Sequence, residues 1–268
     1  MKAIGWIAAS VFRESVRDKV LYNLVVFAII LMGASYLIGQ LTAGQDVKII
    51  KDLGLAATSI FGLFIAVFIG IGLVSKEVER RSIYSLLAKP IERHQIVLGK
   101  YIGLVLTLVV NLAVMAAALY AVLASMLWLD GPSVTRGLEA PLLDPNMLKA
   151  VALTAVELAV VTAIALFFST FSTPILSAAF TFGIFLAGRF SSDLRDFDRV
   201  VNSPAAATLA HALYWALPNL APFDIRAEVV HGQPIPANYL ALTGAYGILY
   251  ITVLLIASIF VFSRRDFK

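Results

Sequence analysis

The chain of 268 residues contains no cysteine. This absence excludes a disulfide framework, thiol catalysis and metal sites built from thiolates. Charged residues are also scarce, at 14% of the chain, whereas 60% of the residues are hydrophobic. Soluble domains contain about a quarter charged residues and about half apolar ones. The composition therefore predicts an integral membrane protein.

A nucleotide-binding loop of the Walker A type is missing as well. Such a loop needs the pattern G-x-x-x-x-G-K-[ST], because its glycines let backbone amides surround a phosphate. The chain's only Gly-Lys pair is Gly99-Lys100, with His94 at the position of the first glycine and Tyr101 in place of serine or threonine. We therefore expect that this chain is not itself an enzyme and binds no cofactor.

Metal and nucleic-acid binding find no support either. The histidines His94, His211 and His231 are scattered, and no H-E-x-x-H pattern exists. Zinc needs three or four converging ligands, so we expect no metal site. The formal net charge is +4, but the basic residues flank apolar segments, where membrane topology alone requires them. We expect no nucleic-acid partner.

The apolar segments predict an all-α fold with six transmembrane helices in one transmembrane domain over residues 1–268. A hydrocarbon core of about 30 Å needs about 20 helical residues. The third segment is long enough to project beyond the bilayer, and the fifth is short. The six predicted spans are residues 20–41, 53–74, 99–128, 149–171, 174–190 and 239–262.

Helices outside the spans are predicted at both sides. Residues 1–19 have the helical apolar stripe of an amphipathic helix, with Lys2, Arg13 and Arg17 largely on the other face, which is typical of a helix lying in the membrane interface. A soluble helix packed on a partner is the alternative. Residues 190–238 are too long for a turn, and the apolar stretch 205–217 is too short to span, so re-entrant or interfacial helices are expected there.

The basic residues predict the orientation. The N-terminal segment, the segment 75–100 and the C-terminal tail together contain 13 of the 21 lysines and arginines. The positive-inside rule therefore places both termini and residues 75–100 in the cytoplasm, and residues 190–238 outside. We expect a multi-pass protein of the bacterial cytoplasmic (inner) membrane in contact with lipid.

Residues 75–100 form a highly charged hairpin between the second and third spans. Its charged side chains need a polar partner or water, and Leu86-Leu87 adds an apolar pair. A merely solvated loop is the alternative. The residues expected to contact a partner are Lys76, Glu77, Glu79, Arg80, Arg81, Tyr84, Leu86, Leu87, Pro90 and Arg93.

Two further features lie in and beside the spans. Glu157 lies in the fourth span, where an ionised carboxylate is costly. We expect it either to line a pathway or gate or to be hydrogen-bonded to a neighbouring helix. Asn111 and Thr107 are possible partners for such a hydrogen bond. Asn111 itself is a second pathway candidate, although helix packing fits it better. Gly99 and Gly103 form a small-xxx-small pattern, and we expect Gly99 to permit the exit from the hairpin.

The order of these features resembles the permease subunits of type-2 ATP-binding-cassette exporters. The resemblance covers nearly the whole chain and rests on the N-terminal helix, the charged hairpin 76–100, the small and Ser-rich segment 167–180, the sequence LPNLAPFDIR at 217–226 and the Arg264-Arg265-Asp266 ending. Many relatives have Gly-Thr after the acidic run, whereas this chain has Arg81-Ser82.

The resemblance implies a dimer of permeases, either two copies of this chain or this chain with a related one, and two cytosolic ATPase subunits. ATP and Mg would bind the ATPases. The hairpin and the cytosolic turn Ser172-Thr173-Pro174 would transmit their closure to the spans, and an unidentified substrate would be exported. Two alternatives stay open: an ion-coupled secondary carrier that uses Glu157, and a membrane scaffold that recruits a cytosolic partner without transport.

Overall fold

The computed structural model describes residues 2–40, 46–79, 92–129, 141–191, 208, 214 and 217–264, and this part of the chain contains helices and no strand. The predicted all-α fold is therefore confirmed for the described residues. The helices are α1 (Lys2–Val16), α2 (Lys19–Gln40), α3 (Asp46–Glu79), α5 (Arg93–Leu129), α6 (Asn146–Ser169), α7 (Pro174–Arg189), the short 3₁₀ helix η3 (Ala221–Phe223), α10 (Arg226–Val230) and α11 (Ala237–Arg264).

Five of these helices are long and apolar enough to cross a membrane: α2, α3, α5, α6 and α11. The prediction that the third span is long is confirmed, because α5 has 37 residues, or about 55 Å at 1.5 Å per residue. The fifth predicted span is α7, which begins at the predicted Pro174 but has only 16 residues. Its length of about 24 Å falls short of a hydrocarbon core of about 30 Å, so six spans are not confirmed.

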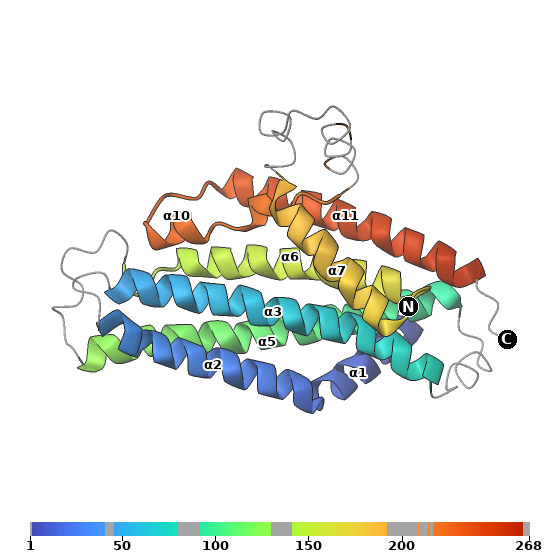
Figure 1. Ribbon diagram of the computed structural model, residues 1–268, viewed down its shortest axis with the longest axis horizontal. Coiled ribbons are helices and arrows are strands. Elements are labelled where there is room, and N and C mark those ends of the chain that lie inside the picture. Colours follow the sequence, from blue (N-terminus) through green and yellow to red (C-terminus); the bar gives the residue numbers. More distant parts are fainter. Residues whose placement is uncertain are drawn as a thin grey trace.

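Helix α6 lies at the centre of the bundle and packs against α3, α5, α7 and α11 (Figure 1). Every residue from Leu158 to Leu166 is buried, and a helix that is apolar on all sides is one that other helices surround. By contrast, only 28% of the most apolar stretch of α2 and 22% of that of α11 is buried. Large apolar side chains such as Phe27 on α2 and Ile248 on α11 are exposed, so these two helices present the apolar outer surface that lipid requires.

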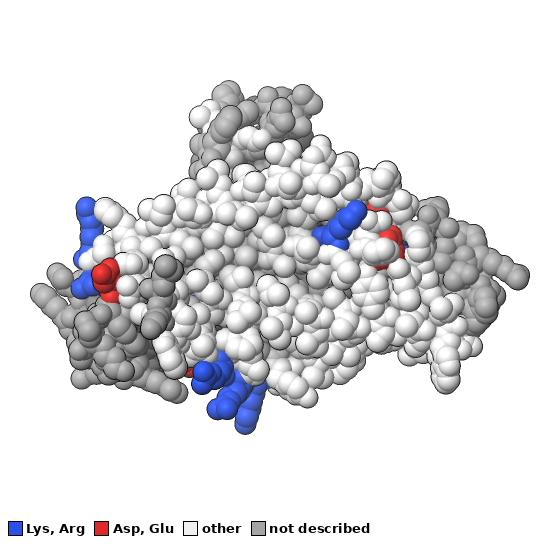
Figure 2. Space-filling model, turned by 180° about the vertical axis from the view of Figure 1, so that it is seen from behind, with Lys and Arg blue, Asp and Glu red and all other residues white. Residues whose placement is uncertain are grey.

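One end of the bundle carries α1 and exposed basic side chains. This end gathers α1, the end of α3, the start of α5, the start of α7 and the end of α11 (Figure 1). Figure 2 shows a largely uncharged surface with a basic group along the edge over α1 and the start of α2, where Arg13, Arg17 and Lys19 are exposed. A helix thus occupies the predicted N-terminal segment, and its place in the membrane interface stays a prediction.

Helix α1 packs against the start of α5 through two glycines. A Cβ atom at Gly99 would lie 2.8 Å from the Cβ of Ile7, and one at Gly103 would lie 2.7 Å from the carbonyl oxygen of Ala8. Small residues four apart let two helix backbones approach closely. The expectation that Gly99 mainly serves the exit from the hairpin was therefore wrong, since both glycines form the surface on which α1 lies.

Gly103→Ala should destabilise the protein by about 1–3 kcal/mol, because the added methyl group meets a backbone carbonyl that can move only with α1. Gly183→Ala on α7 is the matched control: a Cβ there meets nothing within 4 Å, and alanine gains up to about 1 kcal/mol of helix propensity. Thermal unfolding in detergent measures both variants. Equal midpoints would show that α1 does not need this close approach.

Several predicted features lie outside the described residues. They include most of the hairpin, with Arg80, Arg81, Tyr84, Leu86, Leu87 and Pro90, and the helices expected within residues 190–216, of which the structure describes Phe190, Ser191, Thr208 and Tyr214. After residue 216, η3 and α10 occupy the predicted external segment as two short helices. Its placement outside the membrane stays a prediction.

Candidate functional site

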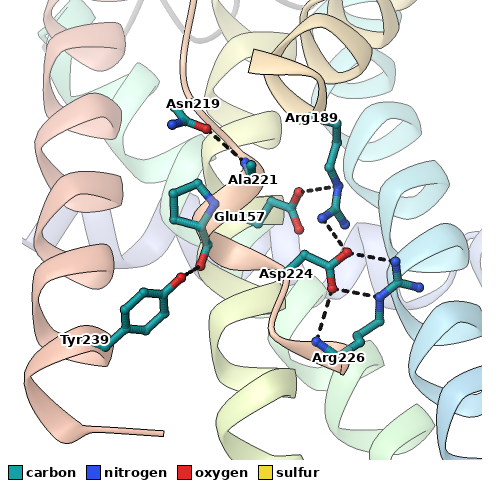
Figure 3. A network of polar contacts seen from close by, with 8 residues as sticks. Glu157, Arg189, Asn219, Ala221, Asp224, Arg226 and Tyr239 are labelled. Carbon is teal, nitrogen blue, oxygen red and sulfur yellow. Dashed lines mark hydrogen bonds and ion pairs between the residues drawn. The ribbon is translucent and has the colours of Figure 1, made fainter. Parts of the chain in front are cut away.

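A chain of alternating charges lies beside the middle of α6 (Figure 3). Glu157 follows the start of α6 by eleven residues and precedes its end by twelve, and its side chain is only 1% exposed. Its Oε1 lies 3.2 Å from Nε of Arg189, which comes from the last turn of α7. Since a lone buried charge is expensive, Arg189 is the partner that makes this carboxylate tolerable.

The end of α7 is fixed by the chain that returns toward α11. The amide N–H of Leu220 donates to the carbonyl oxygen of Gly188 at 2.9 Å. A Cβ on Gly188 would lie 2.6 Å from the carbonyl oxygen of Pro218, so only glycine allows the two backbones to come this close. This contact sets the position from which Arg189 reaches Glu157.

Asp224 continues the charge chain. Its Oδ2 accepts from Arg189 Nη1 at 2.8 Å and from Arg226 Nη2 at 2.8 Å, while its Oδ1 accepts from Nε of Arg226 at 2.8 Å. Arg226 therefore holds Asp224 in a two-pronged pair, which is the strongest geometry for a guanidinium and a carboxylate. Glu157, Arg189, Asp224 and Arg226 thus join α6, α7 and the start of α10.

Burial alone would raise the pKa of Asp224, but the hydrogen bond from Arg226 and the charges of Arg189 and Arg226 outweigh it and hold this pKa below its usual value. The hydrogen bond with Asp224 in turn raises the pKa of Arg226. Because the folded-state pKa of Asp224 is depressed, its contribution to stability is present above its unfolded pKa of about 3.9 and disappears as the pH falls through the folded value. The pair stays ionised at neutral pH.

Contacts with α11 hold the segment before Asp224 in place. The amide N–H of Asn219 donates to the hydroxyl oxygen of Tyr246 at 2.9 Å, and the hydroxyl of Tyr239 donates to the carbonyl oxygen of Pro222 at 2.7 Å. Phe223 is 1% exposed and packs beside Gly247, where a Cβ would lie 3.2 Å from its ring. The segment that carries Asp224 and Arg226 is thus held against α11 by hydrogen bonds and packing.

A pocket of about 590 Å³ adjoins this network. Asp52 of α3 and Glu228 of α10 add two carboxylates to its wall, beside Arg189, Asp224 and Arg226, and Leu186 and Phe190 of the α7 end supply its main apolar surface. Ligand pockets typically enclose about 300–1,000 Å³ and combine apolar walls with a few fixed polar groups. The pocket therefore has the size and the mixed lining of a small-molecule site.

A second buried charge lies near the starts of α3 and α6. Lys51 is 1% exposed, and its Nζ donates to the carbonyl oxygen of Pro141 at 2.6 Å. Asp144 is also buried, and its Oδ1 accepts from the amide N–H of Asn146 at the start of α6 at 2.8 Å. The bond from Lys51 ties α3 to the segment that leads into α6, and the bond to Asp144 stabilises the start of α6, so both have a structural role.

The structure brings Glu157 together with partners that the sequence reasoning did not name. Glu157 pairs with Arg189, whereas the amide of Asn111 donates to the carbonyl oxygen of Thr107 on its own helix at 2.8 Å. Nothing in the sequence singles out Arg189, and Asp224 and Arg226 occur only within the sequence LPNLAPFDIR that contributes to the resemblance. Glu157 itself indicated that a cationic partner exists, because an intramembrane carboxylate requires an opposing charge. The pathway roles of Glu157 and Asn111 stay predictions.

The predicted coupling residues are only partly described. Lys76, Glu77 and Glu79 lie in the last turns of α3. Arg93 begins α5, and its Nη1 donates to the carbonyl oxygens of Phe262 and Ser263 at 3.2 and 2.7 Å, which joins the end of the hairpin to the end of α11. In the predicted turn, the amide N–H of Ser172 donates to the carbonyl oxygen of Phe168 at 2.9 Å, and Thr173 precedes Pro174 at the start of α7. Contact of these residues with an ATPase stays a prediction.

No group of three or more metal-ligating side chains occurs among the described residues. The charged network consists of carboxylates paired with guanidiniums.

Comparison with known proteins places the chain in a family. The family model described as ABC-2 family transporter protein matches residues 5–267, which is nearly the whole chain and includes the charged network and the hairpin. No curated protein matches the sequence.

Proposed function

The chain belongs to the ABC-2 family of transporter proteins and is thus a membrane subunit of an ABC transporter, and we propose that it is the permease of an exporter driven by a separate cytosolic ATPase. The observation that supports this proposal is the family match over residues 5–267. Membership in this family disfavours both the ion-coupled carrier and the scaffold without transport. The substrate is exported by ATP hydrolysis on the partner, where ATP and Mg bind.

The proposed assembly contains two permeases and two ATPases. The permeases are two copies of this chain, or this chain and a related one. Helix α7 then counts as a sixth, shortened span: it begins at the end of the bundle where α1 lies (Figure 1) and ends at Arg189 beside the middle of α6. The segment from Pro218 to Val230 completes the outer half of the bundle in its place.

Coupling at the α1 end of the bundle is supported by three features that meet there (Figure 1). The hairpin joins α3 to α5, Arg93 joins the hairpin end to α11, and the turn before Pro174 begins α7. A displacement of the hairpin by an ATPase would therefore reach α11 through Arg93, and a displacement of the turn would reach Arg189 along α7.

Co-purification tests the proposed function. We expect the chain, co-expressed with the ABC ATPases of its own genome, to form a stable complex with one of them, in which ATP hydrolysis depends on both subunits. A matched complex with a Walker A lysine variant of the ATPase should assemble without hydrolysis. Failure of any ABC ATPase to associate with the purified chain would contradict the proposal.

The orientation has its own test, which the absence of cysteine makes simple. We expect Ser192→Cys to react with a membrane-impermeant maleimide in intact cells and Ser82→Cys to react only after the membrane is permeabilised. The reason is the concentration of basic residues on the side of residue 82. The reverse labelling pattern would overturn the orientation.

A further inference from the structure

The pocket beside the charge chain has an excess of negative charge. Three carboxylates and two guanidiniums line it, and Glu157 lies directly behind Arg189. The two guanidiniums are already engaged, because Asp224 accepts from both of them at 2.8 Å. An anionic ligand would thus have to compete with Asp224 for each arginine.

Two carboxylates besides Asp224 line the pocket, those of Asp52 and Glu228. Asp52 is exposed, and its negative charge acts on Arg226. Glu228 has a buried Oε2 that has no hydrogen-bond partner among the described residues. A buried acceptor without a donor costs about 1–3 kcal/mol, so a ligand that donates a hydrogen bond to the Glu228 carboxylate, once this side chain turns toward the pocket, would recover this cost.

Glu157 also favours a ligand that carries a positive charge. Its side chain is 1% exposed, and its Oε1, although 3.2 Å from Nε of Arg189, accepts no hydrogen bond from the described residues. Arg189 is shared between this carboxylate and Asp224. The negative potential behind the pocket is therefore only partly neutralised, and in a region of low dielectric it acts over a longer distance than in water.

The apolar wall indicates the rest of the ligand. Leu186 and Phe190 are 55% and 58% exposed, and both line the pocket at the end of α7. Farther along the same helix, Phe180 and Leu176 are exposed as well. An apolar chain leaving the pocket could therefore lie against α7, while its polar head faces the carboxylates.

From this geometry we propose that the pocket binds an amphiphile with a cationic amine head, with the ammonium group donating to Glu228 and attracted by Asp52, and with the apolar chain against Leu186 and Phe190. That such an amphiphile is the transported substrate rests on the proposed function. The binding site itself does not, because it is formed by this chain alone.

The test uses the purified full chain in a non-ionic detergent without any ATPase, and octylamine as the probe at neutral pH, where it is an ammonium ion. Octanol and octyl sulfate are the neutral and anionic comparisons of equal chain length. Isothermal titration calorimetry should show saturable binding of octylamine that is weakened by salt, as expected for a charge interaction near the surface. Octanol and octyl sulfate should bind at least tenfold more weakly.

Two isosteric variants locate the site. Glu228→Gln should weaken octylamine binding by about tenfold, which is the loss expected for a hydrogen bond to a charged group, and Asp52→Asn should weaken it several-fold. Glu14→Gln is the matched control, since it removes an exposed carboxylate from α1 at the other end of the bundle. Asp52 is exposed, so its variant reports on binding even where Glu228→Gln folds poorly.

Tighter binding of octyl sulfate, equal binding of octanol, or unchanged octylamine binding in Asp52→Asn would overturn the site. Stimulation of ATP hydrolysis by octylamine in the assembled complex, lost in the same variants, would support the substrate assignment. Specific binding without stimulation in an otherwise active complex would overturn that assignment and leave the site standing. Absence of any ATPase partner would instead contradict the proposed function.

Discussion

Arg189→Met should be among the most destabilising single substitutions in this protein. It removes the charge that lies 3.2 Å from the buried Glu157 and one of the two cations that bind Asp224. Breaking a buried ion pair from one side costs about 3–5 kcal/mol, because the remaining charge stays buried without compensation. Thermal unfolding of the purified protein in detergent should show a large fall in the midpoint.

Substitution of Glu157, the other member of the ion pair, should destabilise the protein much less. Glu157→Gln leaves Arg189 bound to Asp224 at 2.8 Å, so we expect folding and assembly to persist, with a changed rate of substrate-stimulated ATP hydrolysis by the partner. The double variant Glu157→Gln/Arg189→Met should recover a large part of the stability lost in Arg189→Met, since no uncompensated charge remains at Glu157. Such a double-mutant cycle isolates the pair.

Arg13→Met is the matched control, because Arg13 is exposed on α1 and surface substitutions usually change stability by less than about 0.5 kcal/mol. If Arg189→Met and Arg13→Met unfold at the same temperature, the ion pair does not stabilise the fold. If Glu157→Gln also leaves stability and ATP hydrolysis unchanged, the transport path must be sought along other helices.

Local patterns in the sequence were sufficient to find the helices. Apolar runs of the right length gave the five long helices, and Pro174 marked the start of α7, because proline fits the first helical turn. They were not sufficient to decide whether α7 spans the membrane. Its end depends on Gly188 lying against Pro218 and on Arg189 reaching Glu157, and both contacts join residues about 30 positions apart.

The candidate site was likewise only partly predictable from local patterns in the sequence. Glu157 was recognisable because one carboxylate in an apolar run is conspicuous, whereas Asp224 and Arg226 lie in a short segment with no helical or strand period to reveal which way they face. Gly99 and Gly103 were likewise recognisable as a pattern, but only the position of α1 shows what packs on them. Sequence periodicity identifies a special position, and the tertiary contact supplies its partner.

These contacts suggest how the two ends of the protein are linked. Helix α7 runs from the turn Ser172-Thr173-Pro174 to Arg189, so a rigid displacement at the turn changes the geometry of the ion pair with Glu157. Helix α11 provides a second connection, because Arg93 binds its last carbonyls and Tyr239 holds the carbonyl of Pro222 near its start. Helix α7 ends, and helix α11 begins, at the segment that positions Asp224.

Charge reversal in the hairpin should have the largest effect on function. In the double variant Glu79→Lys/Arg81→Glu, the two charges change sign while the net charge of the hairpin stays the same, so the positive-inside signal and membrane insertion are preserved. We expect the ATPase to be lost from the purified complex, because like charges placed opposite each other in an interface cost several kcal/mol. Coupled ATP hydrolysis and transport should disappear with it.

The matched control is Lys149→Glu in the first turn of α6, which lies at the other end of the bundle and where a negative charge suits the helix N-terminus. That variant should retain the ATPase. The measurement is the ratio of ATPase to permease after affinity purification, together with the amount of permease in the membrane. Normal complex yield and normal coupled hydrolysis in Glu79→Lys/Arg81→Glu would show that these two residues do not form the contact. The coupling surface would then have to lie on another element at the same end of the bundle, such as the turn Ser172-Thr173-Pro174 or α1.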